Sequence, residues 1–398
     1  MSETRKWIPE LDGLRVLMIF VVSWYHIWQQ SWLRPAVGSY SLDYLVRSGY
    51  IWVDGTVLLS SFLLFLPYAK AMRERAPAPD TRTFYYRRVR RILPGYYFII
   101  LATLFTVALP WKLYDSAQYL VKDVAAHLTF IFPFFRDTYI STPLGAASWT
   151  LAIEVQAYAL FPLIARGAMK KPALTLGAMC AVCFGFRAWC LWALTDYSMV
   201  VNQLINFLDV YTAGILAAMA YVRFSERQAP AAGGTRTRCI RQALATVCFA
   251  AALFGLIQML KFQASSGDYV LIQRRQMIYR PVYALCFTGL ILSAPFSLLP
   301  LRKLLGNPVT RFLGGISMNY YLIHQTVIVH LKRLHFPPSV SDTPNTAGEQ
   351  PWQNQYTFLS FGISLLLAIL VTYLIEKPAA RALDRIRRRR SISSSPSV

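Results

Sequence analysis

Apolar windows of about twenty residues recur along the whole chain, the length that a helix needs to cross the hydrocarbon core of a bilayer. Charged residues make up only 15% of the 398 residues, fewer than a soluble enzyme of this size usually carries. We therefore predict an all-α, polytopic membrane protein with about ten transmembrane helices. The expected spans are residues 14–31, 51–70, 92–110, 147–165, 173–194, 202–222, 241–260, 279–300, 311–331 and 355–375.

The distribution of basic residues predicts the orientation of these spans. With ten spans and the N-terminus inside, 28 lysines and arginines fall in inner segments and 11 in outer segments. This excess follows the positive-inside rule, so both termini are expected in the cytoplasm and the protein in the cell inner membrane. The short apolar stretch at residues 121–135 contains polar residues, and we predict a re-entrant or interfacial helix on the outer side. Because topology explains the net charge of +22, we expect no nucleic-acid partner.

Composition predicts a single membrane domain, residues 1–380, with no second folded domain. Residues 381–398 form a basic, Ser-rich cytoplasmic tail, which we expect to be disordered and attracted to anionic membrane lipid. Residues 229–237 are expected to form a flexible cytoplasmic linker. The first apolar segment has no small-residue cleavage site after it, so we expect it to be retained as a helix.

The six cysteines do not predict a disulfide framework. Cys180 and Cys183 form a CxxC pair, but the pair lies inside an apolar span and has no second pair to complete a metal site. We therefore interpret them as small buried hydrophobic residues and expect no metal.

Two ionisable residues, Arg15 and His26, lie within the first expected span. They are eleven residues apart, about 16 Å and nearly three turns on a helix, so both occupy nearly the same face. Ionisable groups at membrane depth are costly and commonly line a cavity where they do chemistry. One helix thus presents a cation toward the inner side and an imidazole toward the outer side. Alone, Arg15 could equally be a snorkelling residue that holds the helix at the interface.

Two carboxylates are expected at the same depth as His26. Asp54 begins the second span near the outer side, and Glu154 lies about two helical turns into the fourth span. A carboxylate beside an imidazole fixes its tautomer and raises its basicity, as a general base requires. A buried ion network that only orients helices is the alternative, but the matching depths favour a catalytic site of His26, Asp54 and Glu154.

Other polar residues give weaker signals. A cluster of arginines before the third span is typical of a topological anchor and could also bind cofactor phosphates; it comprises Arg87, Arg88, Arg90 and Arg91. Arg187 and Asp209 lie in neighbouring spans and are expected to pair. His324 follows a run of small and polar residues that predicts close helix packing and a polar seam. Three histidines in or near loops carry no specific signal: His127, His330 and His335.

The sequence resembles the acyltransferase-3 family of integral membrane O-acyltransferases over nearly its whole length. Residues 11–15 read Leu-Asp-Gly-Leu-Arg, and with His26 they resemble the family's L-D-G-L-R run and its arginine–x10–histidine spacing. Five further segments resemble family motifs in the same order: residues 52–63, 87–94, 148–158, 315–324 and 376–378. Each motif is loose by itself, but six in the right order on ten spans are specific.

The sequence differs from the family motifs at several positions. Gly55 and the two residues after it replace an aromatic pair, Ser61 replaces a glycine, and Val155 replaces a second glutamate after Glu154. These changes affect the shape expected for the acceptor pocket, whereas the histidine and its acids are kept. Some family members carry a fused extracytoplasmic esterase-like domain, which we do not expect in this chain.

The resemblance implies an O-acyltransferase. Its donor would be cytoplasmic acyl-CoA, with acetyl-CoA expected, and its acceptor a hydroxyl of a glycan or a lipid-linked saccharide outside the membrane. His26 would be the general base or a transient acyl carrier, oriented by Asp54 or Glu154, while Arg15 and the arginine cluster would bind CoA. Acceptor contacts are expected from Trp149, Tyr158, Ser317, Tyr321 and His324. A homo-oligomer is compatible with this interpretation.

A transporter or flippase is the alternative class, because it could use the same buried charges to move a solute or a proton. Many transporters carry internal repeats and paired broken helices, and neither pattern is found in this sequence. The sequence therefore favours the enzyme.

Overall fold

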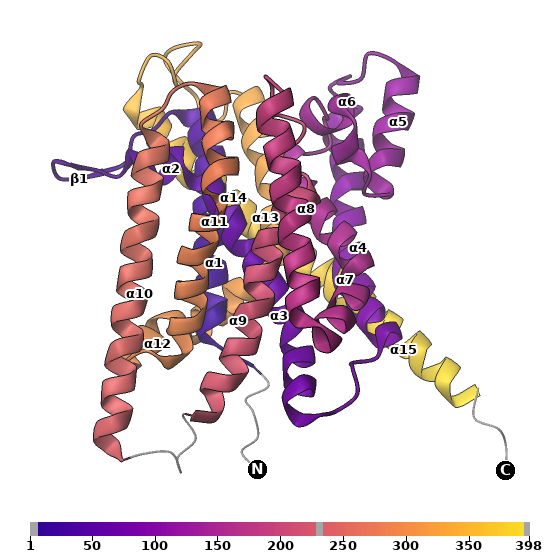
Figure 1. Ribbon diagram of the computed structural model, residues 1–398. Coiled ribbons are helices and arrows are strands. Elements are labelled where there is room, and N and C mark those ends of the chain that lie inside the picture. The colour runs from indigo at the N-terminus through magenta and orange to yellow at the C-terminus, as the bar shows by residue number, and fades with distance from the viewer. Residues whose placement is uncertain (1–6, 228–233, 394–398) are drawn as a thin grey trace. The chain divides into compact units, whose positions relative to one another are not determined.

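The computed structural model describes residues 7–227 and 234–393, and helices dominate it (Figure 1). Nine helical segments of the described chain are long and apolar enough to cross a membrane. A further helix, α13 (Pro308–Arg333), has 26 residues but is interrupted by polar side chains. It coincides with the ninth expected span. The prediction of an all-α, polytopic membrane protein is confirmed.

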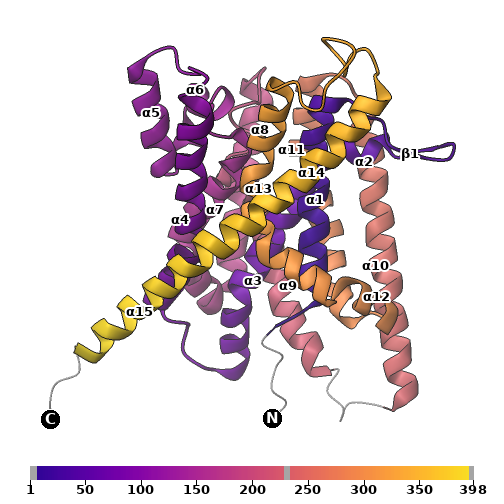
Figure 2. The same cartoon turned by 180° about the vertical axis from the view of Figure 1, so that it is seen from behind.

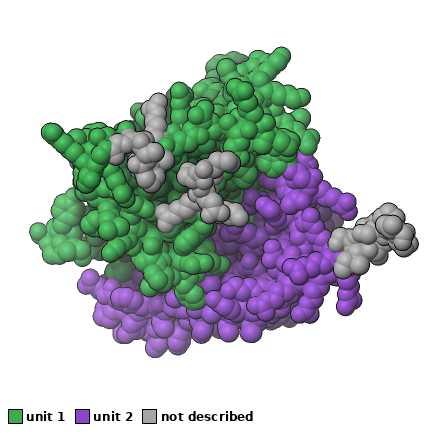
Figure 3. All heavy atoms as spheres, turned by 90° about the horizontal axis from the view of Figure 1, so that it is seen from below, with its two compact units in different colours: residues 1–79, 150–315 green, residues 80–149, 316–398 purple. Residues whose placement is uncertain are grey.

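Contacts divide the chain into two compact units, which Figure 3 shows in different colours. Unit 1 comprises residues 1–79 and 150–315, and unit 2 comprises residues 80–149 and 316–398. Helices α7 (Trp149–Lys170) and α13 each begin in one unit and continue in the other.

Unit 1 is a helical bundle in which α3 packs against α1, α9 and α11, and α10 packs against α11. A small antiparallel hairpin, β1 (Ala36–Val37) with β2 (Tyr40–Ser41), follows α1. Besides most of α7, the helices of this unit are α1 (Glu10–Ser31), α2 (Asp43–Arg47), η1 (Gly49–Ile51), α3 (Trp52–Glu74), α8 (Pro172–Ala193), η5 (Leu204–Phe207), α9 (Leu208–Arg227), α10 (Thr235–Ala264), α11 (Tyr269–Ser293), η6 (Ala294–Phe296) and α12 (Leu299–Leu305).

The packing of α3 explains two of the departures from the family motif. A Cβ atom on Gly55 would lie 2.6 Å from the ring of Phe287 on α11. Phe287 therefore occupies the space that a side chain at position 55 would need. The Ser61 hydroxyl donates to the backbone oxygen of Tyr211 on α9, at 2.7 Å. At both positions, a residue on another helix of the same unit contacts the substituted residue.

In unit 2, helix α4 packs against η7 and α15. The segment from α14 through η7 to α15 runs as one long helix, drawn in yellow tones in Figure 2. Helix α5 has only 12 residues, about 18 Å, which is too short to cross a bilayer and agrees with the interfacial helix expected there. Besides most of α13, the helices of this unit are α4 (Thr81–Thr103), η2 (Leu104–Ala108), α5 (Ala117–Leu128), η3 (Phe132–Phe134), α6 (Arg136–Ile140), η4 (Ala146–Ser148), α14 (Gln350–Val371), η7 (Thr372–Glu376) and α15 (Lys377–Ser393).

Two helices begin well before the spans expected from hydropathy. Asp80 caps α4 by accepting from the backbone N–H of Thr83 at 2.7 Å, and hydrogen bonds with the Thr83 side chain and backbone lower the pKa of the Asp80 carboxyl. Asp268 caps α11 by accepting from the backbone N–H of Leu271 at 3.0 Å. Helices α4 and α11 therefore extend before the spans expected from residues 92 and 279, over segments whose arginines lower the mean hydropathy.

The expectation of a disordered tail from residue 381 is not met through Ser393, because α15 is helical to that residue. Contacts within unit 2 hold its first turns. Asp384 accepts from the Tyr86 hydroxyl at 2.8 Å and pairs with Arg90 at 3.1 Å, and Arg387 donates to Thr83 at 3.1 Å. Residues 394–398 lie outside the described residues. So do residues 229–233 of the expected linker, whereas Thr235 already begins α10.

The topology gives a direct prediction. With both termini inside, a reporter fused after Arg333 is expected to report from the outer side, and one fused after Arg390 from the cytoplasm, because α14 and its continuation make one crossing between them. Paired alkaline-phosphatase and fluorescent-protein fusions measure this. An extracytoplasmic signal from the second fusion would contradict the topology.

Candidate functional site

His26 lies near the C-terminal end of α1 and is half-buried. Its Nδ1 atom is 3.0 Å from Oε1 of Gln29, one turn further along the same helix. Because a carboxamide oxygen only accepts, Nδ1 carries the proton in this bond and the lone pair resides on Nε2. The Gln29 amide in turn donates to the Tyr25 hydroxyl at 2.9 Å. The imidazole is therefore held in the tautomer that a base acting through Nε2 requires.

Aromatic rings also lie beside this short network. The Tyr25 ring lies 5.0 Å from the His26 ring and 5.3 Å from the Tyr50 ring, centroid to centroid. The sequence pointed to carboxylates as partners of His26 and did not single out Gln29. Residues three apart on a helix are neighbours, so the spacing of His26 and Gln29 in the sequence could have indicated this contact.

Asp54 has a different partner from the one expected. It is fully buried on α3, and its Oδ1 atom is 2.7 Å from Nε of Arg280, which is fully buried on α11. The Arg280 guanidinium also lies 3.9 Å from the centroid of the Phe207 ring. A buried guanidinium requires a counter-charge, and Asp54 supplies it. Asp54 therefore pairs α3 with α11, and its part in the orientation of His26 stays a prediction.

A second buried ion pair continues this network, as expected from the sequence. Arg187 on α8 contacts Asp209 on α9 through two bonds of 2.6 and 2.8 Å. Arg187 also donates to the side chain of Asn206 at 2.7 Å, and both buried arginines donate to the Asn206 backbone oxygen. Two arginines and two aspartates thus balance in charge and link α3, α8, α9 and α11.

Glu154 and Tyr158 lie together on α7. The Tyr158 hydroxyl donates to Oε2 of Glu154 at 2.6 Å and is 3.4 Å from the Ser60 hydroxyl on α3. The partner of Glu154 in this bond is neutral, in contrast to the guanidinium that faces Asp54. A predicted catalytic acid and a predicted acceptor contact are therefore brought together by one helix.

Arg15 lies in the second turn of α1, on the same continuous helix as His26. Its guanidinium is 3.6 Å from Oδ1 of Asp12, and the other oxygen of Asp12 accepts from the Trp7 indole at 2.9 Å. The side chain is one-fifth exposed. Arg15 is thus tethered at the N-terminal end of α1, about 16 Å along the helix from His26.

The arginine cluster lies in unit 2, on the first half of α4. Arg90 pairs with Asp384, and the Arg88 guanidinium lies 5.5 Å from the centroid of the Phe84 ring. Arg87 and Arg91 are exposed. Two members therefore contribute to packing within the unit, while the exposed members present their charge to the surroundings.

The remaining predicted contacts also lie in unit 2. His324 and Ser317 are buried on α13, and Nδ1 of His324 is 2.6 Å from the backbone oxygen of Tyr321. Asn319 donates to Thr372 at 2.8 Å and to Glu376 at 2.6 Å. This face of α13 is the polar seam that the sequence predicted. Trp149 is the first residue of α7 and is half-buried.

Comparisons with known proteins show the family of this chain. The family described as "Acyltransferase domain" matches residues 8–377. The peptidoglycan O-acetyltransferase OatA of Listeria monocytogenes is 27% identical over 186 residues, which is 44% of this chain and 27% of that protein. The O-acetyltransferase OatA of Staphylococcus aureus is 29% identical over 170 residues, 40% of this chain and 25% of that protein. The matched segment thus spans about a quarter of each relative's length. No solved structure matches the chain.

Proposed function

The chain belongs to the acyltransferase-3 family, and we propose that it is an O-acetyltransferase that moves an acetyl group from cytoplasmic acetyl-CoA to a hydroxyl of an extracytoplasmic glycan. The relatives named peptidoglycan O-acetyltransferases support acetyl as the group and a glycan as the acceptor. The observation that carries the proposal is the hydrogen bond between His26 and Gln29, which leaves Nε2 of the imidazole as the basic atom. We place the protein in the cell inner membrane as a multi-pass protein.

In the proposed reaction, Nε2 of His26 removes the proton from the acceptor hydroxyl as its oxygen attacks the thioester carbon. The carbon–sulfur bond then breaks, and the CoA thiolate leaves with the proton that the imidazolium returns. Gln29 keeps the ring in the required tautomer. In the variant route the imidazole itself attacks the thioester, and an acetyl-His26 intermediate then transfers the group.

Glu154 remains the carboxylate that we propose for the stabilisation of the imidazolium. Asp54 is less suited to this role because Arg280 already matches its charge at 2.7 Å. Glu154 accepts from the neutral Tyr158 hydroxyl, so its negative charge is available to a nearby cation. Tyr158 is proposed to contact the acceptor, while Trp149 and the residues of the α13 seam stay predicted acceptor contacts.

For the donor, we propose that Arg15 binds the phosphates of CoA, and the arginine cluster of α4 stays a predicted phosphate contact. An arginine fork suits phosphate because it supplies several charge-assisted hydrogen bonds. The pantetheine arm would then extend along α1 over the roughly 16 Å from Arg15 to His26. In this arrangement, the thioester reaches the imidazole while the nucleotide remains on the cytoplasmic side.

Arg15→Lys is expected to weaken acetyl-CoA binding although the charge remains, and Arg15→Ala is expected to weaken it more. The reason is that lysine is a point charge and loses the bidentate geometry. Direct titration of CoA into the detergent-solubilised protein measures the effect, with Arg47→Lys, on the short helix α2, as a matched control. Equal CoA affinity in the parent and both Arg15 variants would make Arg15 an anchor of the helix.

The proposed function is tested most directly by mass spectrometry of envelope glycans with and without the gene. Acetyl esters that depend on the gene are expected. The purified protein should also release CoA from acetyl-CoA. A transporter is the competing outcome: proteoliposomes would take up solute without consuming acetyl-CoA, and the glycans would be unchanged.

A further inference from the structure

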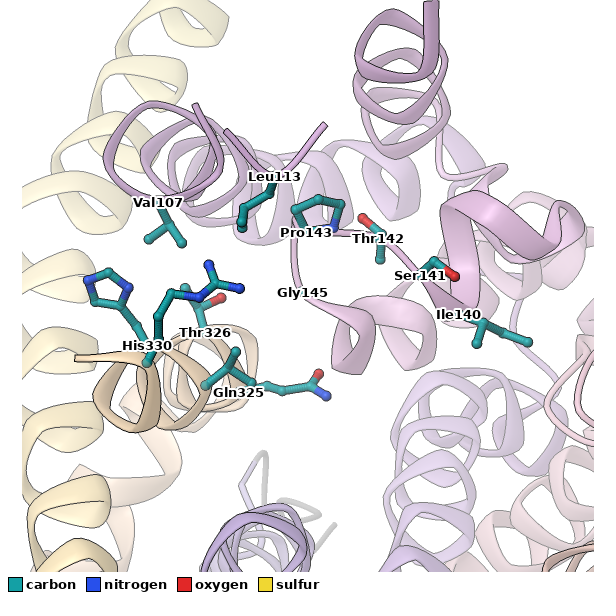
Figure 4. A pocket seen from close by; sticks show the side chains of 12 residues that line it. Val107, Leu113, Ile140, Ser141, Thr142, Pro143, Gly145, Gln325, Thr326 and His330 are labelled. Carbon is teal, nitrogen blue, oxygen red and sulfur yellow. The ribbon is translucent and has the colours of Figure 1, made fainter. Parts of the chain in front are cut away.

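Unit 2 contains a cavity of about 370 Å³ that the sequence did not indicate (Figure 4). One wall is the last turns of α13, with Gln325, Thr326, His330 and Arg333, and the facing wall is the segment after α6 that includes Thr142. The volume falls in the range of cavities that hold small ligands. In the predicted topology, this end of α13 faces the outer side of the membrane.

The wall formed by the segment after α6 is fixed by hydrogen bonds from α5 and the residues before it. Asp123 is fully buried and accepts from the hydroxyls of Thr142 and Tyr114, both at 2.8 Å. The Tyr119 hydroxyl donates to the backbone oxygen of Ser141 at 3.2 Å. Burial raises the pKa of Tyr119 to about 12. The wall is therefore held in place before any ligand arrives.

The two walls are also joined to each other. Oε1 of Gln325 on α13 accepts from the backbone N–H of Ala147. Gly145 adopts a left-handed φ of +105°, and a Cβ atom there would lie 3.4 Å from the Thr326 hydroxyl. Glycine permits this turn beside α13. The cavity is thus a built feature of unit 2 and not a gap between loose segments.

The lining combines polar and apolar side chains and contains one permanent cation. Arg333 lies with its guanidinium 5.6 Å from the Trp111 ring centroid, and the His330 ring lies edge-on to the same indole at 5.8 Å. Hydroxyls and a carboxamide supply hydrogen-bonding groups, while Val107 and Leu113 supply apolar surface. Among the described residues that line the cavity, none is acidic. A bound ligand is therefore well placed to supply the anion that faces Arg333.

We propose that this cavity binds a sugar residue of the acceptor that carries an acidic substituent. The proposal rests on the proposed function, because it identifies the class of acceptor. Hydroxyl and carboxamide side chains suit sugar hydroxyls, and the apolar side chains suit the C–H face of a pyranose. Arg333 binds the acidic group through charge-assisted hydrogen bonds, for which its fork geometry is suited.

The test uses the full-length protein in nanodiscs of phosphatidylcholine. Binding of N-acetylmuramic acid is compared with binding of N-acetylglucosamine, which lacks the lactyl carboxylate, by saturation-transfer NMR titration. The parent is expected to prefer the acidic sugar about tenfold, since a charge-assisted bond contributes on that order. Arg333→Gln is expected to remove the preference and leave the neutral sugar unaffected. Arg136→Gln, an exposed arginine outside the cavity, serves as the matched control and should keep the preference.

The outcomes separate this proposal from the proposed function. If the parent hydrolyses acetyl-CoA but binds both sugars equally, or if Arg333→Gln keeps the preference, the cavity assignment is wrong while the enzyme assignment stands. If the preference depends on Arg333 but acetyl-CoA is never consumed, the cavity is supported and the proposed function fails. Nanodiscs that contain phosphatidylglycerol give the last comparison. Loss of sugar binding there would assign the cavity to a lipid headgroup and overturn the proposal.

Discussion

His26→Ala is expected to lower acetyl transfer by about 10² to 10⁴, because that is the usual contribution of a positioned general base. The protein is expected to insert and fold normally, since His26 is half-buried and its hydrogen bond to Gln29 stays within the same helix. The measurement is the initial rate of acetyl transfer from labelled acetyl-CoA to the glycan acceptor by purified protein. Thermal unfolding of the same sample reports whether the fold is kept.

Variants of Gln29 test whether its hydrogen bond to His26 is needed for catalysis when the imidazole itself is kept. Gln29→Glu keeps an oxygen that accepts from Nδ1 and is expected to retain much more activity than Gln29→Leu, which has no acceptor. Both variants leave His26 in place. If His26→Ala transfers acetyl groups at a near-normal rate, His26 is neither base nor acyl carrier. If the two Gln29 variants are equally active, the hydrogen bond does not orient the ring.

The sequence predicts local features of this molecule better than its long-range pairs. The eleven-residue spacing of Arg15 and His26 places both on α1, and the structure has them on one continuous helix. The Arg187–Asp209 pair was also predicted, because both residues lie within clear apolar spans. Helical periodicity and span order are local properties, so one sequence is enough to recognise them.

The burial of Arg280 was not predicted, because a charged residue was interpreted as part of a solvent-exposed loop. Arg280 follows two other arginines near the start of α11, and it was counted with these outer cations although the expected span began at residue 279. Whether such a residue lies in solvent or in a bundle depends on its neighbours in space. Asp54 lies more than two hundred positions earlier in the chain, and no local pattern connects the two.

Arg280→Met is expected to destabilise the protein by about 3 to 5 kcal/mol, because it leaves the Asp54 carboxylate buried without its counter-charge. Both side chains have zero exposure, so solvent cannot compensate the loss. Asp54→Leu is expected to be similarly costly, since it leaves the guanidinium unmatched. Unfolding of the purified protein in mixed micelles, followed over a denaturant series, measures these differences.

The double variant Asp54→Leu with Arg280→Met is expected to recover a large part of the loss, because an apolar pair of similar volume needs no counter-charge. Recovery should be incomplete. Arg280 also donates to the backbone oxygens of Val201 and Asn206, at 2.9 and 3.2 Å, and methionine cannot replace these bonds. Recovery of stability without loss of acetyl transfer would show that Asp54 holds helices together and is not part of the chemistry.

An exposed ion pair between two helices of the same unit provides the matched control. Arg73 on α3 and Glu226 on α9 are 2.8 Å apart, but the Arg73 side chain is 63% exposed. Arg73→Met is therefore expected to change stability little, because water replaces the lost partner of Glu226. A loss at Arg73 as large as that at Arg280 would mean that burial is not what makes the Asp54–Arg280 pair important. If Arg280→Met is as stable as the parent, Asp54 does not depend on Arg280, and its assignment to the orientation of His26 should be restored.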